Sequence, residues 1–428
     1  MTTGTRADSS IVEVRLTPVA FVEPPLRNSA GVHGTTVARL VIEVHTAGGA
    51  VGLGETFGDP AVLAVAREAA RRLPGGDVFD LVELARILDV DPLVDGQPDV
   101  VTAAEVREPG TFAGTTRVKA YSAFEVAFLD AQGRLLDRPV HQLLGGRVRS
   151  EVDFCGYLFF KFGAHPGEPE DEWGEVLDPA AMVGLAQRFV ADYGFGSLKL
   201  KGGVLDPVAE VETLERLAAA FPGVALRIDP NAAWTVPTSL DVARKTDGLV
   251  QYLEDPTAGL TGMAHVASAT STPLATNMVV TSFRQIRRCV ELGSAGIILA
   301  DHHFWGGLRA TQQLGAVCAA LGLRLSMHSN SHLGISLAAM VQAAAVLPGL
   351  DYSCDTHYPW TVEDVVDAPV IKEGRIAVGD APGLGVTLDR DQLARMHERW
   401  LRDGERPRDD VAAMRRHVPG WVDRRPRW

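Results

Sequence analysis

The stretch GSLKLKGG at residues 196–203 decides the fold of the chain. It places Lys199 and Lys201 two residues apart in an otherwise apolar run that ends in two glycines. Residues two apart on a strand face the same side, so both ammonium groups point in one direction. Such a pair usually faces solvent, but the apolar neighbours are typical of a buried strand. The stretch therefore predicts a strand that carries two lysines toward the inside of a protein.

Short apolar runs of this kind recur along the chain, with helical stretches between them. Counted in order they are DFCGYLFF (153–160), SLKLK (197–201), ALRIDPN (225–231), LVQYLED (249–255), PLATN (273–277), GIILAD (296–301), RLSMHS (324–329) and DYSCDTHY (351–358). Eight strands that alternate with helices predict an α/β protein with a TIM-like (β/α) barrel, whose active site is built at the carboxyl ends of the strands. Polar residues do cluster at these ends, and burying them without a ligand would cost free energy.

The first 145 residues have a different pattern. Two alternating runs, at 11–22 and 37–55, predict an antiparallel meander, and the apolar spacing at 61–73, 80–88 and 120–136 predicts helices. We therefore expect an N-terminal α+β capping domain over residues 1–145 and a (β/α) barrel catalytic domain over 146–385. We expect the C-terminal segment, 386–428, to pack back toward the capping domain.

Composition narrows the class of function. The chain has 428 residues and a formal net charge of −13, which argues against nucleic acid as a partner. The four cysteines lie far apart, which indicates buried thiols in a reducing compartment rather than disulfides. The first residues do not resemble a signal peptide, and no apolar run is long enough to span a membrane. We expect a cytoplasmic protein without a membrane partner.

Three polar residues at successive strand ends suit a metal ion. Asp229, Glu254 and Asn277 offer two carboxylates and an amide oxygen, a hard oxygen-only set that Mg²⁺ prefers. Each residue alone could instead be the N-cap of the following helix, but that alternative explains three adjacent strands poorly.

Two lysines and a histidine, on roughly opposite sides of the barrel mouth, suit proton transfer. Two neighbouring ammonium groups depress each other's pKa and burial adds to this, so one lysine could act as a base near neutral pH. His328 ends the seventh strand beside Asp301, whose carboxylate could fix the imidazole tautomer. A substrate carboxylate on the metal would then present its α-carbon to Lys201 on one face and to His328 on the other.

With these residues in place, the chain resembles the enolase superfamily, and specifically its glucarate dehydratase subgroup. The combination of a Lys or His base with Mg²⁺ is a known property of that superfamily. The motifs that carry the resemblance are KLKGGV (199–204), DPNAAW (229–234), EDP (254–256), ATNM (275–278), ADHHFW (300–305), HSNSH (328–332), DTH (355–357), NSAGVH (28–33), TF (111–112), GYLFF (156–160) and RDD (408–410). The resemblance implies a modified, enolase-type barrel and a small acid-sugar substrate.

The resemblance also implies a role for each matching residue. Asp229, Glu254 and Asn277 would bind Mg²⁺, and Lys201 and His328 would be the two acid/base groups. Asp301 would be the partner of His328, while Lys199 and Asn231 would support the enediolate. The residues that would read the substrate hydroxyls and its distal carboxylate are Asn28, His33, Thr111, Tyr157, Phe159 through its backbone, Asn330, His357 and Arg408.

The sequence leaves several alternatives open. A two-base site could epimerise the α-carbon instead of expelling a hydroxyl, and a superfamily relative could be non-catalytic. The two histidines of HSNSH have the spacing of a zinc site, but the motif lacks the glutamate of metallohydrolases and starts at a strand end. The loops after the fourth and sixth strands differ from those of typical glucarate dehydratases, so the resemblance does not imply which sugar acid is used. Superfamily relatives are often symmetric oligomers, and we expect this chain to form a homo-oligomer.

Overall fold

The capping part of the molecule is an antiparallel sheet covered by helices. The computed structural model describes residues 7–93 and 115–428. The sheet has the order β1 (Ile11–Val22), β2 (Thr36–Thr46), β3 (Val51–Phe57), and its helices are α1 (Pro60–Arg72), α2 (Leu81–Leu88), α3 (Thr116–Leu136) and α4 (Val140–Leu143). The predicted meander and helices are confirmed. The second alternating run differs in one respect, because a turn around Gly49, which has a φ of 82°, divides it into two strands.

Helix α3 lies close to this sheet because two glycines leave room for its backbone. A Cβ atom on Gly52 would lie 1.9 Å from the carbonyl oxygen of Ala127, and one on Gly54 would lie 2.1 Å from that of Ala123. The two glycines face the same side of β3 because they are two residues apart. The alternating glycines of this strand therefore allow a close packing of helix on sheet.

The eight predicted barrel strands are all present and parallel. They are β4 (Glu151–Phe159), β5 (Ser197–Lys201), β6 (Ala225–Asp229), β7 (Leu253–Glu254), β8 (Leu274–Thr276), β9 (Ile297–Ala300), β10 (Arg324–Met327) and β11 (Cys354–Thr356). Their spatial order is β10, β9, β8, β7, β6, β5, β4, β11. The last and first strands of this order meet where Asp351 N donates to Leu325 O at 2.9 Å and Ser326 Oγ donates to Ser353 O at 3.0 Å.

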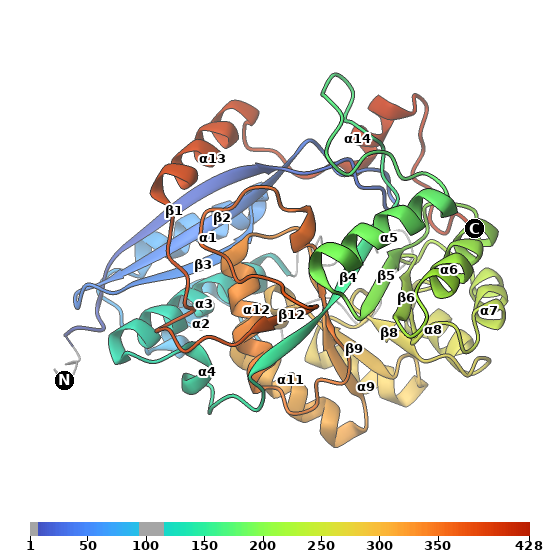
Figure 1. The fold of residues 1–428 in the computed structure, drawn as a ribbon. Coiled ribbons are helices and arrows are strands. Elements are labelled where there is room, and N and C mark those ends of the chain that lie inside the picture. The colour runs from blue at the N-terminus through green and yellow to red at the C-terminus, as the bar shows by residue number, and fades with distance from the viewer. Residues whose placement is uncertain (1–6, 94–114) are drawn as a thin grey trace.

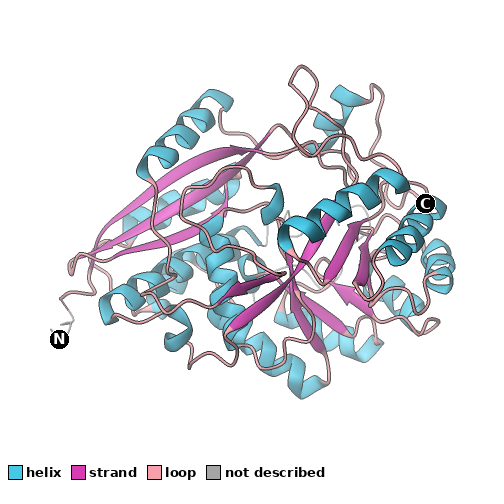
Figure 2. Ribbon diagram, in the orientation of Figure 1, coloured by secondary structure: helices cyan, strands magenta, loops and turns pink. Residues whose placement is uncertain are grey.

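Helices connect these strands and cover the outside of the barrel (Figures 1 and 2). They are α5 (Pro179–Tyr193), α6 (Pro207–Ala220), α7 (Val236–Lys245), α8 (Gly259–Ala267), α9 (Phe283–Leu292), α10 (His302–Trp305), α11 (Gly307–Leu321) and α12 (Gly334–Val346), followed by the 3₁₀ helix η2 (Tyr358–Trp360). The α/β fold with a TIM-like barrel and a capping α+β part is confirmed.

After the last parallel strand, the chain first adds a strand to the edge of β4 and then returns to the capping sheet. Strand β12 (Arg375–Ala377) pairs antiparallel with β4. Helix α13 (Arg390–Asp403) lies against β1, where Arg399 donates to Ala20 O at 3.0 Å (Figure 1). Helix α14 (Asp410–His417) then begins beside the loop that follows β1, because Asn28 donates to Asp410 at 2.7 Å. The domain boundaries at residues 145 and 385 stay a prediction.

Candidate active site

The structure brings most of the predicted site residues to the carboxyl ends of the barrel strands. Strand β4 carries Tyr157 and Phe159, β5 carries Lys199 and Lys201, β6 ends in Asp229 and is followed by Asn231, β7 ends in Glu254, β8 is followed by Asn277, β9 by Asp301, β10 by His328 and Asn330, and β11 by His357. All of these residues except Asn330 are buried. Thr111, which was predicted to bind substrate, lies outside the described residues.

Two of the three predicted metal ligands, Glu254 and Asn277, contain polar atoms that the described residues leave without hydrogen bonds, whereas both oxygens of Asp229 accept hydrogen bonds. Both carboxylate oxygens of Glu254 and the amide oxygen and nitrogen of Asn277 are buried and have no hydrogen-bond partner. Lys199 Nζ lies 2.5 Å from Glu254 Oε2, an ion pair without the direction of a hydrogen bond. Buried polar atoms are rarely left unpaired, so these atoms fit a group from outside the chain.

The local charges make a cation the group that fits. Burial raises the pKa of Glu254 well above its usual value, and the negative charges of Asp229, Asp355 and Asp255 add to this against the opposing effect of Lys199. A divalent cation would remove this repulsion between carboxylates. Two carboxylates and an amide oxygen are a donor set for Mg²⁺ and not for Zn²⁺, so the residues present fit the predicted ion.

The two lysines have different environments. Lys199 is fully buried and ion-paired with Asp355 at 2.7 Å as well as with Glu254. Burial would lower the pKa of Lys199, but Asp355, Glu254 and Asp229 raise it well above the usual value. This differs from our expectation that the paired ammonium groups would lower the pKa of both, because the sequence does not show that three carboxylates surround Lys199.

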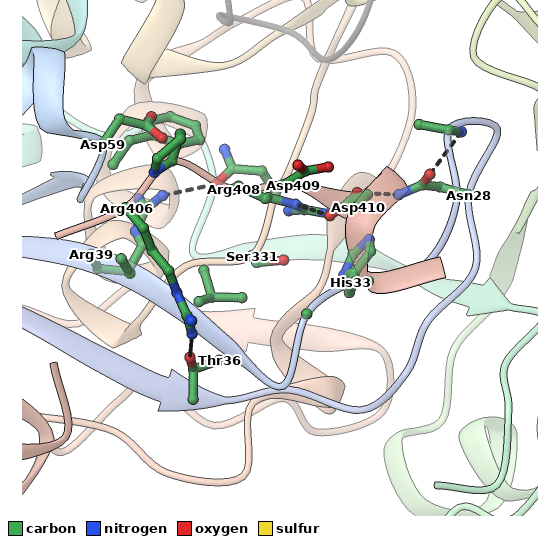
Figure 3. Close-up of a pocket in the computed structure, with 18 of the residues that line it drawn as sticks. Asn28, His33, Thr36, Arg39, Asp59, Ser331, Arg406, Arg408, Asp409 and Asp410 are labelled. Atoms are coloured by element: carbon green, nitrogen blue, oxygen red, sulfur yellow. Dashed lines mark hydrogen bonds and ion pairs between the residues drawn. The ribbon is translucent and has the colours of Figure 1, made fainter. Parts of the chain in front are cut away.

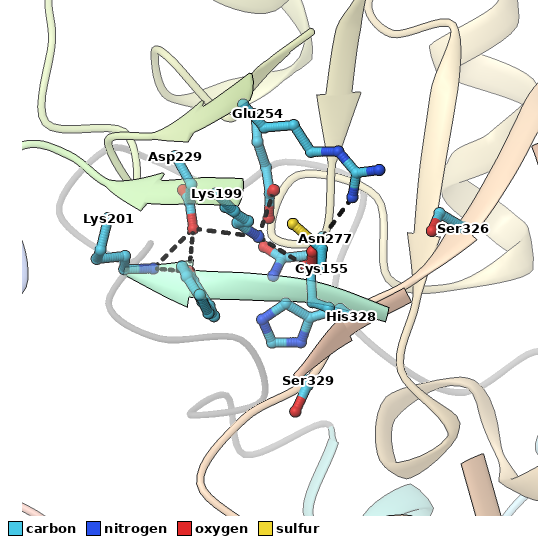
Figure 4. A network of polar contacts seen from close by, with 12 residues as sticks. Cys155, Lys199, Lys201, Asp229, Glu254, Asn277, Ser326, His328 and Ser329 are labelled. Carbon is cyan, nitrogen blue, oxygen red and sulfur yellow. Dashed lines mark hydrogen bonds and ion pairs between the residues drawn. The ribbon is translucent and has the colours of Figure 1, made fainter. Parts of the chain in front are cut away.

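Lys201 lies two residues further along β5 than Lys199, lines the cavity and is held in place by two oxygen atoms. Its Nζ donates to Asp229 Oδ2 at 2.7 Å and to Tyr157 Oη at 2.9 Å, and Tyr157 Oη donates to the same Asp229 oxygen at 2.8 Å. Figure 4 shows Lys201 at one side of the group formed by Asp229, Glu254 and Asn277, with His328 at the other side. Tyr157 was predicted to contact substrate, and here it positions Lys201.

His328 and Asp301 form the predicted pair. His328 Nδ1 lies 3.2 Å from Asp301 Oδ2, and Asn330 Nδ2 donates to the same oxygen at 2.7 Å. A charged carboxylate accepts hydrogen bonds, so His328 Nδ1 carries the proton and Nε2 is free for proton transfer. Burial lowers the pKa of His328, although Asp301 opposes this shift. His328 is therefore a neutral imidazole that can accept a proton.

Asn231 connects the metal side of the mouth to the capping loop. Its backbone has a φ of 48°, and its Nδ2 donates to Asp229 Oδ1 at 3.1 Å. Its carbonyl oxygen accepts from Ser29 Oγ at 3.5 Å. The left-handed backbone at this position turns the side chain back toward the end of its own strand.

Residues from the capping part and the tail close a cavity of about 1130 Å³ over the barrel mouth. The predicted residues that line it are Asn28, His33, Tyr157, Phe159, Lys201, Asn231, His328, Asn330, His357 and Arg408. Figure 3 shows Asn28, His33 and Arg408 converging on Asp410 and its surroundings. Arg408 binds Asp410 through two hydrogen bonds of 2.7 and 2.8 Å. The tail thus contributes to the wall of the cavity.

Two histidines of this wall lie side by side, and the orientation of His33 is fixed by a carboxylate. His33 Nδ1 lies 2.7 Å from Glu23 Oε2, and Ser331 Oγ donates to Glu23 Oε1 at 2.5 Å. The rings of His33 and His357 are stacked with centroids 6.2 Å apart. Glu23 was not predicted, because the sequence does not show that this carboxylate after β1 is buried beside His33 and Ser331.

The alternative of a zinc pair in HSNSH does not fit. Both ring nitrogens of His332 are used, since Nε2 lies 3.0 Å from Ser329 Oγ and Nδ1 lies 3.0 Å from Leu333 O. In the described part of the chain, the one group of three or more His, Cys, Asp and Glu side chains close enough to share a metal ion is Asp301, His302 and His303. Within this group, His303 Nδ1 already lies 2.7 Å from Asp301 Oδ1, at hydrogen-bond distance.

Two residues outside the prediction are central to the site. Asp355 at the end of β11 binds Lys199, and Asp255, directly after Glu254, accepts hydrogen bonds from the backbone N–H groups of Asn277 and Met278 at 2.9 and 3.1 Å. Both are acidic residues at strand ends, which is the signal by which the other site residues were found.

No described helix is long and apolar enough to cross a membrane.

Comparison with known families matches most of the chain. Residues 11–145 match the family "Mandelate racemase / muconate lactonizing enzyme, N-terminal domain", and residues 181–392 match "Enolase C-terminal domain-like". A protein of Streptomyces coelicolor named probable glucarate dehydratase is 49% identical over 98% of this chain and 99% of its own length. The L-talarate/galactarate dehydratase of Salmonella typhimurium is 25% identical over 87% of this chain and 86% of its own.

Solved structures are equally similar. An enolase from Thermobispora bispora, complexed with magnesium and formate, has a TM-score of 0.91 and 48% identity, and covers 98% of this chain and 100% of its own. An enolase from Pseudomonas fluorescens with bound magnesium, potassium and tartrate has a TM-score of 0.93 and 47% identity, and covers 98% of this chain and 99% of its own. The resemblance predicted from the motifs is confirmed.

Proposed function

This chain belongs to the enolase superfamily, and we propose that it is a Mg²⁺-dependent acid-sugar dehydratase that resembles glucarate dehydratase. The observation that carries the proposal is the set of buried polar atoms of Glu254 and Asn277 that have no hydrogen-bond partner, with Lys201 on one side and His328 on the other. Relatives named as dehydratases of glucarate, of talarate and galactarate, and of xylonate support the reaction class.

Asp229, Glu254 and Asn277 would hold the metal ion. Bound Mg²⁺ supplies Lewis-acid polarisation of the substrate carboxylate, which makes the α-proton easier to remove. Lys199 lies beneath these ligands and keeps its proton, because the surrounding carboxylates raise its pKa. Its positive charge lowers the energy of negative charge that develops on the substrate oxygens.

Lys201 and His328 would move the protons. In its neutral form Lys201 takes the α-proton at Nζ, and Asp229 and Tyr157 hold the resulting ammonium in place. His328 takes the proton instead when the opposite configuration presents it to Nε2. When His328 is the base, its Nε2 carries the α-proton; when Lys201 is the base, His328 first takes up a proton from water at Nε2. In both cases His328 then donates this proton to the departing β-hydroxyl, which leaves as water. The enol that remains tautomerises to a keto-deoxy sugar acid.

The cavity wall would select the substrate. Asn28, His33, Asn330, His357 and Arg408 offer donors and acceptors to the hydroxyl groups and the distal carboxylate. A net charge of −13 repels anions at long range, so the cations at the mouth must bind an acidic substrate locally. A cytoplasmic location and a homo-oligomeric state stay predictions.

The test is incubation of the purified protein with Mg²⁺ and a panel of aldaric and aldonic acids in D₂O. Keto-acid formation and α-deuterium uptake are followed together, with a chelator as the control. Keto acid from at least one aldaric or aldonic acid supports the dehydratase. Mg²⁺ binding without either signal from any acid contradicts the substrate class and favours a non-catalytic relative.

Acid-sugar epimerase or racemase activity is the second candidate, since Lys201 and His328 lie on opposite sides of the metal ligands. Deuterium uptake with inversion of the α-carbon and without keto acid would favour it.

A further inference from the structure

The carboxylate of Asp301 accepts more hydrogen bonds than its pairing with His328 requires. Its Oδ2 accepts from His328 Nδ1 and Asn330 Nδ2, as described above. Its Oδ1 lies 2.9 Å from the backbone nitrogen of His303 and 2.7 Å from the Nδ1 atom of the same residue. Two imidazoles therefore share one carboxylate, and the proposed mechanism uses only one of them.

The neighbours of His303 determine its tautomer. Its Nε2 lies 3.3 Å from Nη2 of Arg39, which is 0% exposed, and 3.0 Å from Ser336 Oγ. A guanidinium can only donate, so His303 Nε2 must be the acceptor and carry no proton. The single proton of the neutral ring is then on Nδ1, where it is donated to Asp301.

Arg39 belongs to the capping part of the molecule and is itself fixed. It lies on β2, and its Nε donates to Glu55 Oε1 on β3 at 2.8 Å. Glu55 also accepts from the backbone N–H groups of Leu333 and Ser336, both at 2.9 Å, near the start of α12. Arg39 Nη1 donates to Asn330 Oδ1 at 3.3 Å, so Arg39 reaches Asp301 through two different residues.

We propose that Arg39 and His303 are positioning residues that, as a hydrogen-bonded relay from the capping sheet, hold the Asp301 carboxylate and through it the imidazole of His328. The relay runs from Glu55 to Arg39, His303, Asp301 and His328. Docking of the capping sheet on the barrel thus completes the acid/base group, in addition to closing the cavity. The part that concerns turnover rests on the proposed function, whereas the part that concerns the His328 tautomer does not.

The relay predicts an effect on one acid/base group only. Lys201 is positioned by Asp229 and Tyr157, which lie outside the relay. Loss of the relay should therefore weaken proton donation by His328 and leave proton abstraction by Lys201 unchanged. A general defect in folding would reduce both steps.

The first experiment needs no substrate. Selective ¹⁵N labelling of histidine reports the tautomer of each ring by NMR in the wild type, in His303→Phe and in the control His302→Phe. His302 is buried like His303, and their ring centroids are 4.0 Å apart. We expect His328 to keep a single Nδ1–H tautomer in the wild type and in the control, and to show both tautomers in His303→Phe. A single Nδ1–H tautomer of His328 in His303→Phe overturns the proposal.

The second experiment uses the substrate found in the D₂O panel. In His303→Phe we expect kcat for keto-acid formation to fall by about 10- to 100-fold, as for other residues that orient a ligand or base. We expect KM, and α-deuterium uptake from acids whose α-proton faces Lys201, to stay near the wild-type values. An equal loss of both signals, or no loss of keto-acid formation, overturns the proposal for turnover.

A second variant covers the case in which His303→Phe does not fold. Arg39→Lys keeps the positive charge beside Glu55 but cannot reach His303 and Asn330 at the same time. We expect the same tautomer change at His328 and the same selective loss, to a smaller extent. If no acid reacts with the wild type, the proposed function fails, and the NMR result still decides the relay.

Discussion

The two sides of the barrel mouth differ in how their polar atoms are satisfied. On the side of β6, β7 and β8, Glu254 and Asn277 have buried atoms without hydrogen bonds. On the side of β9 and β10, Asp301 accepts four N–H groups, and His328 has one ring nitrogen fixed and one free. We propose that the first side binds an ion from outside, whereas the second is organised by the chain itself. Unpaired buried atoms therefore mark where a ligand binds, and fully paired atoms mark a preorganised group.

The largest effect is expected from Glu254→Gln, which removes a charge from the incomplete side. Mg²⁺ affinity should fall by more than the roughly 100-fold seen when residues behind metal ligands are changed, because Glu254 is a proposed ligand itself. Keto-acid formation should be lost in parallel. Calorimetric titration with Mg²⁺ measures the affinity.

Thermal unfolding gives an independent control for Glu254→Gln. At Mg²⁺ concentrations about 100 times the dissociation constant, the wild type should gain about 2.7 kcal/mol of stability, and the variant should gain almost none. Glu125→Gln, which changes an equally buried carboxylate outside the cavity, should respond to Mg²⁺ like the wild type. An unchanged Mg²⁺ affinity in Glu254→Gln would contradict the assignment of this side as the metal site.

The second prediction concerns the preorganised side. His328→Asn should reduce keto-acid formation by about 10²- to 10⁴-fold, the usual contribution of general acid–base catalysis. Mg²⁺ binding should be unchanged, because the metal ligands lie on other strands. Deuterium uptake through Lys201 should persist, which parallel NMR and keto-acid assays would detect.

The control for this variant is His332→Asn, which also removes a buried imidazole. Both ring nitrogens of His332 bind Ser329 and Leu333, so it has no free nitrogen for proton transfer. We expect its turnover to stay close to that of the wild type. If both variants lose the same activity, the effect is one of packing and His328 has no special role.

The third prediction concerns Asp255, which we expect to hold the proposed metal ligands in position. Asp255 has a φ of 39° and accepts from Thr276 Oγ1 at 2.6 Å as well as from the backbone of Asn277 and Met278. It thus joins the proposed ligands Glu254 and Asn277. Asp255→Asn should lower Mg²⁺ affinity by about 10- to 100-fold.

Thr276→Val is the matched control, because it removes one hydrogen bond to Asp255 and keeps the two from the backbone. We expect a smaller loss of Mg²⁺ affinity than in Asp255→Asn, because Asp255 keeps its charge and its two hydrogen bonds from the backbone. Equal affinities for the wild type and Asp255→Asn would mean that the ligands hold their geometry without Asp255.

The fold and the chemical groups could be predicted because strand ends in a barrel converge on one place. A polar residue at the end of each apolar run, such as Asp229 or His328, is then enough to locate the site. Glu23, Arg39 and His303 could not be predicted in the same way. His303 lies near Asp301 in the sequence, but the contacts of Glu23 with Ser331 and of Arg39 with His303 and Asn330 join segments far apart, so only the packing of the capping sheet on the barrel brings them together.

The environment of each lysine was also beyond the sequence. The spacing of Lys199 and Lys201 predicts that both face the interior, but it does not give the distance of either to a carboxylate. Asp355 comes from the last strand, β11, and lies next to Lys199 because β11 pairs with β4, which pairs with β5. The direction of a pKa shift follows from such contacts, and the expected direction for Lys199 was therefore wrong.

The smallest effect is expected on the pH dependence of stability. It concerns two carboxylates of the capping part that accept hydrogen bonds from the first residues of barrel helices. Glu55 binds α12 and has Arg39 beside it, whereas Glu125 accepts from the backbone N–H groups of Leu308 and Arg309 in α11 at 3.0 and 3.1 Å. Among the described residues, no cation lies within ion-pair distance of Glu125. Burial accordingly raises the pKa of Glu125 to about 7. Burial would also raise the pKa of Glu55, but Arg39 and other neighbours lower it.

These opposite shifts predict opposite dependences of stability on pH. The unfolded chain ionises Glu125 near pH 4.5, but the folded chain keeps the proton up to about pH 7. The stability that this carboxyl contributes is therefore complete below pH 4.5 and is lost as the pH rises to 7, a change of about 3 kcal/mol. Glu125→Gln should remove this dependence. The free energy of unfolding of the wild type relative to the variant should fall between pH 5 and pH 7.5, as measured by urea titration.

Glu55→Gln provides the contrast that separates the cause from burial alone. The lowered pKa of Glu55 gives a contribution that is present above its unfolded pKa and is lost as the pH falls through the folded value. The difference between the wild type and Glu55→Gln should therefore stay constant over the range in which Glu125→Gln changes. A parallel change in both variants would mean that burial dominates at both sites and that the ion pair with Arg39 does not keep Glu55 ionised. A constant difference for both would mean that the backbone N–H groups at the start of α11 are enough to hold Glu125 as a carboxylate without a cation.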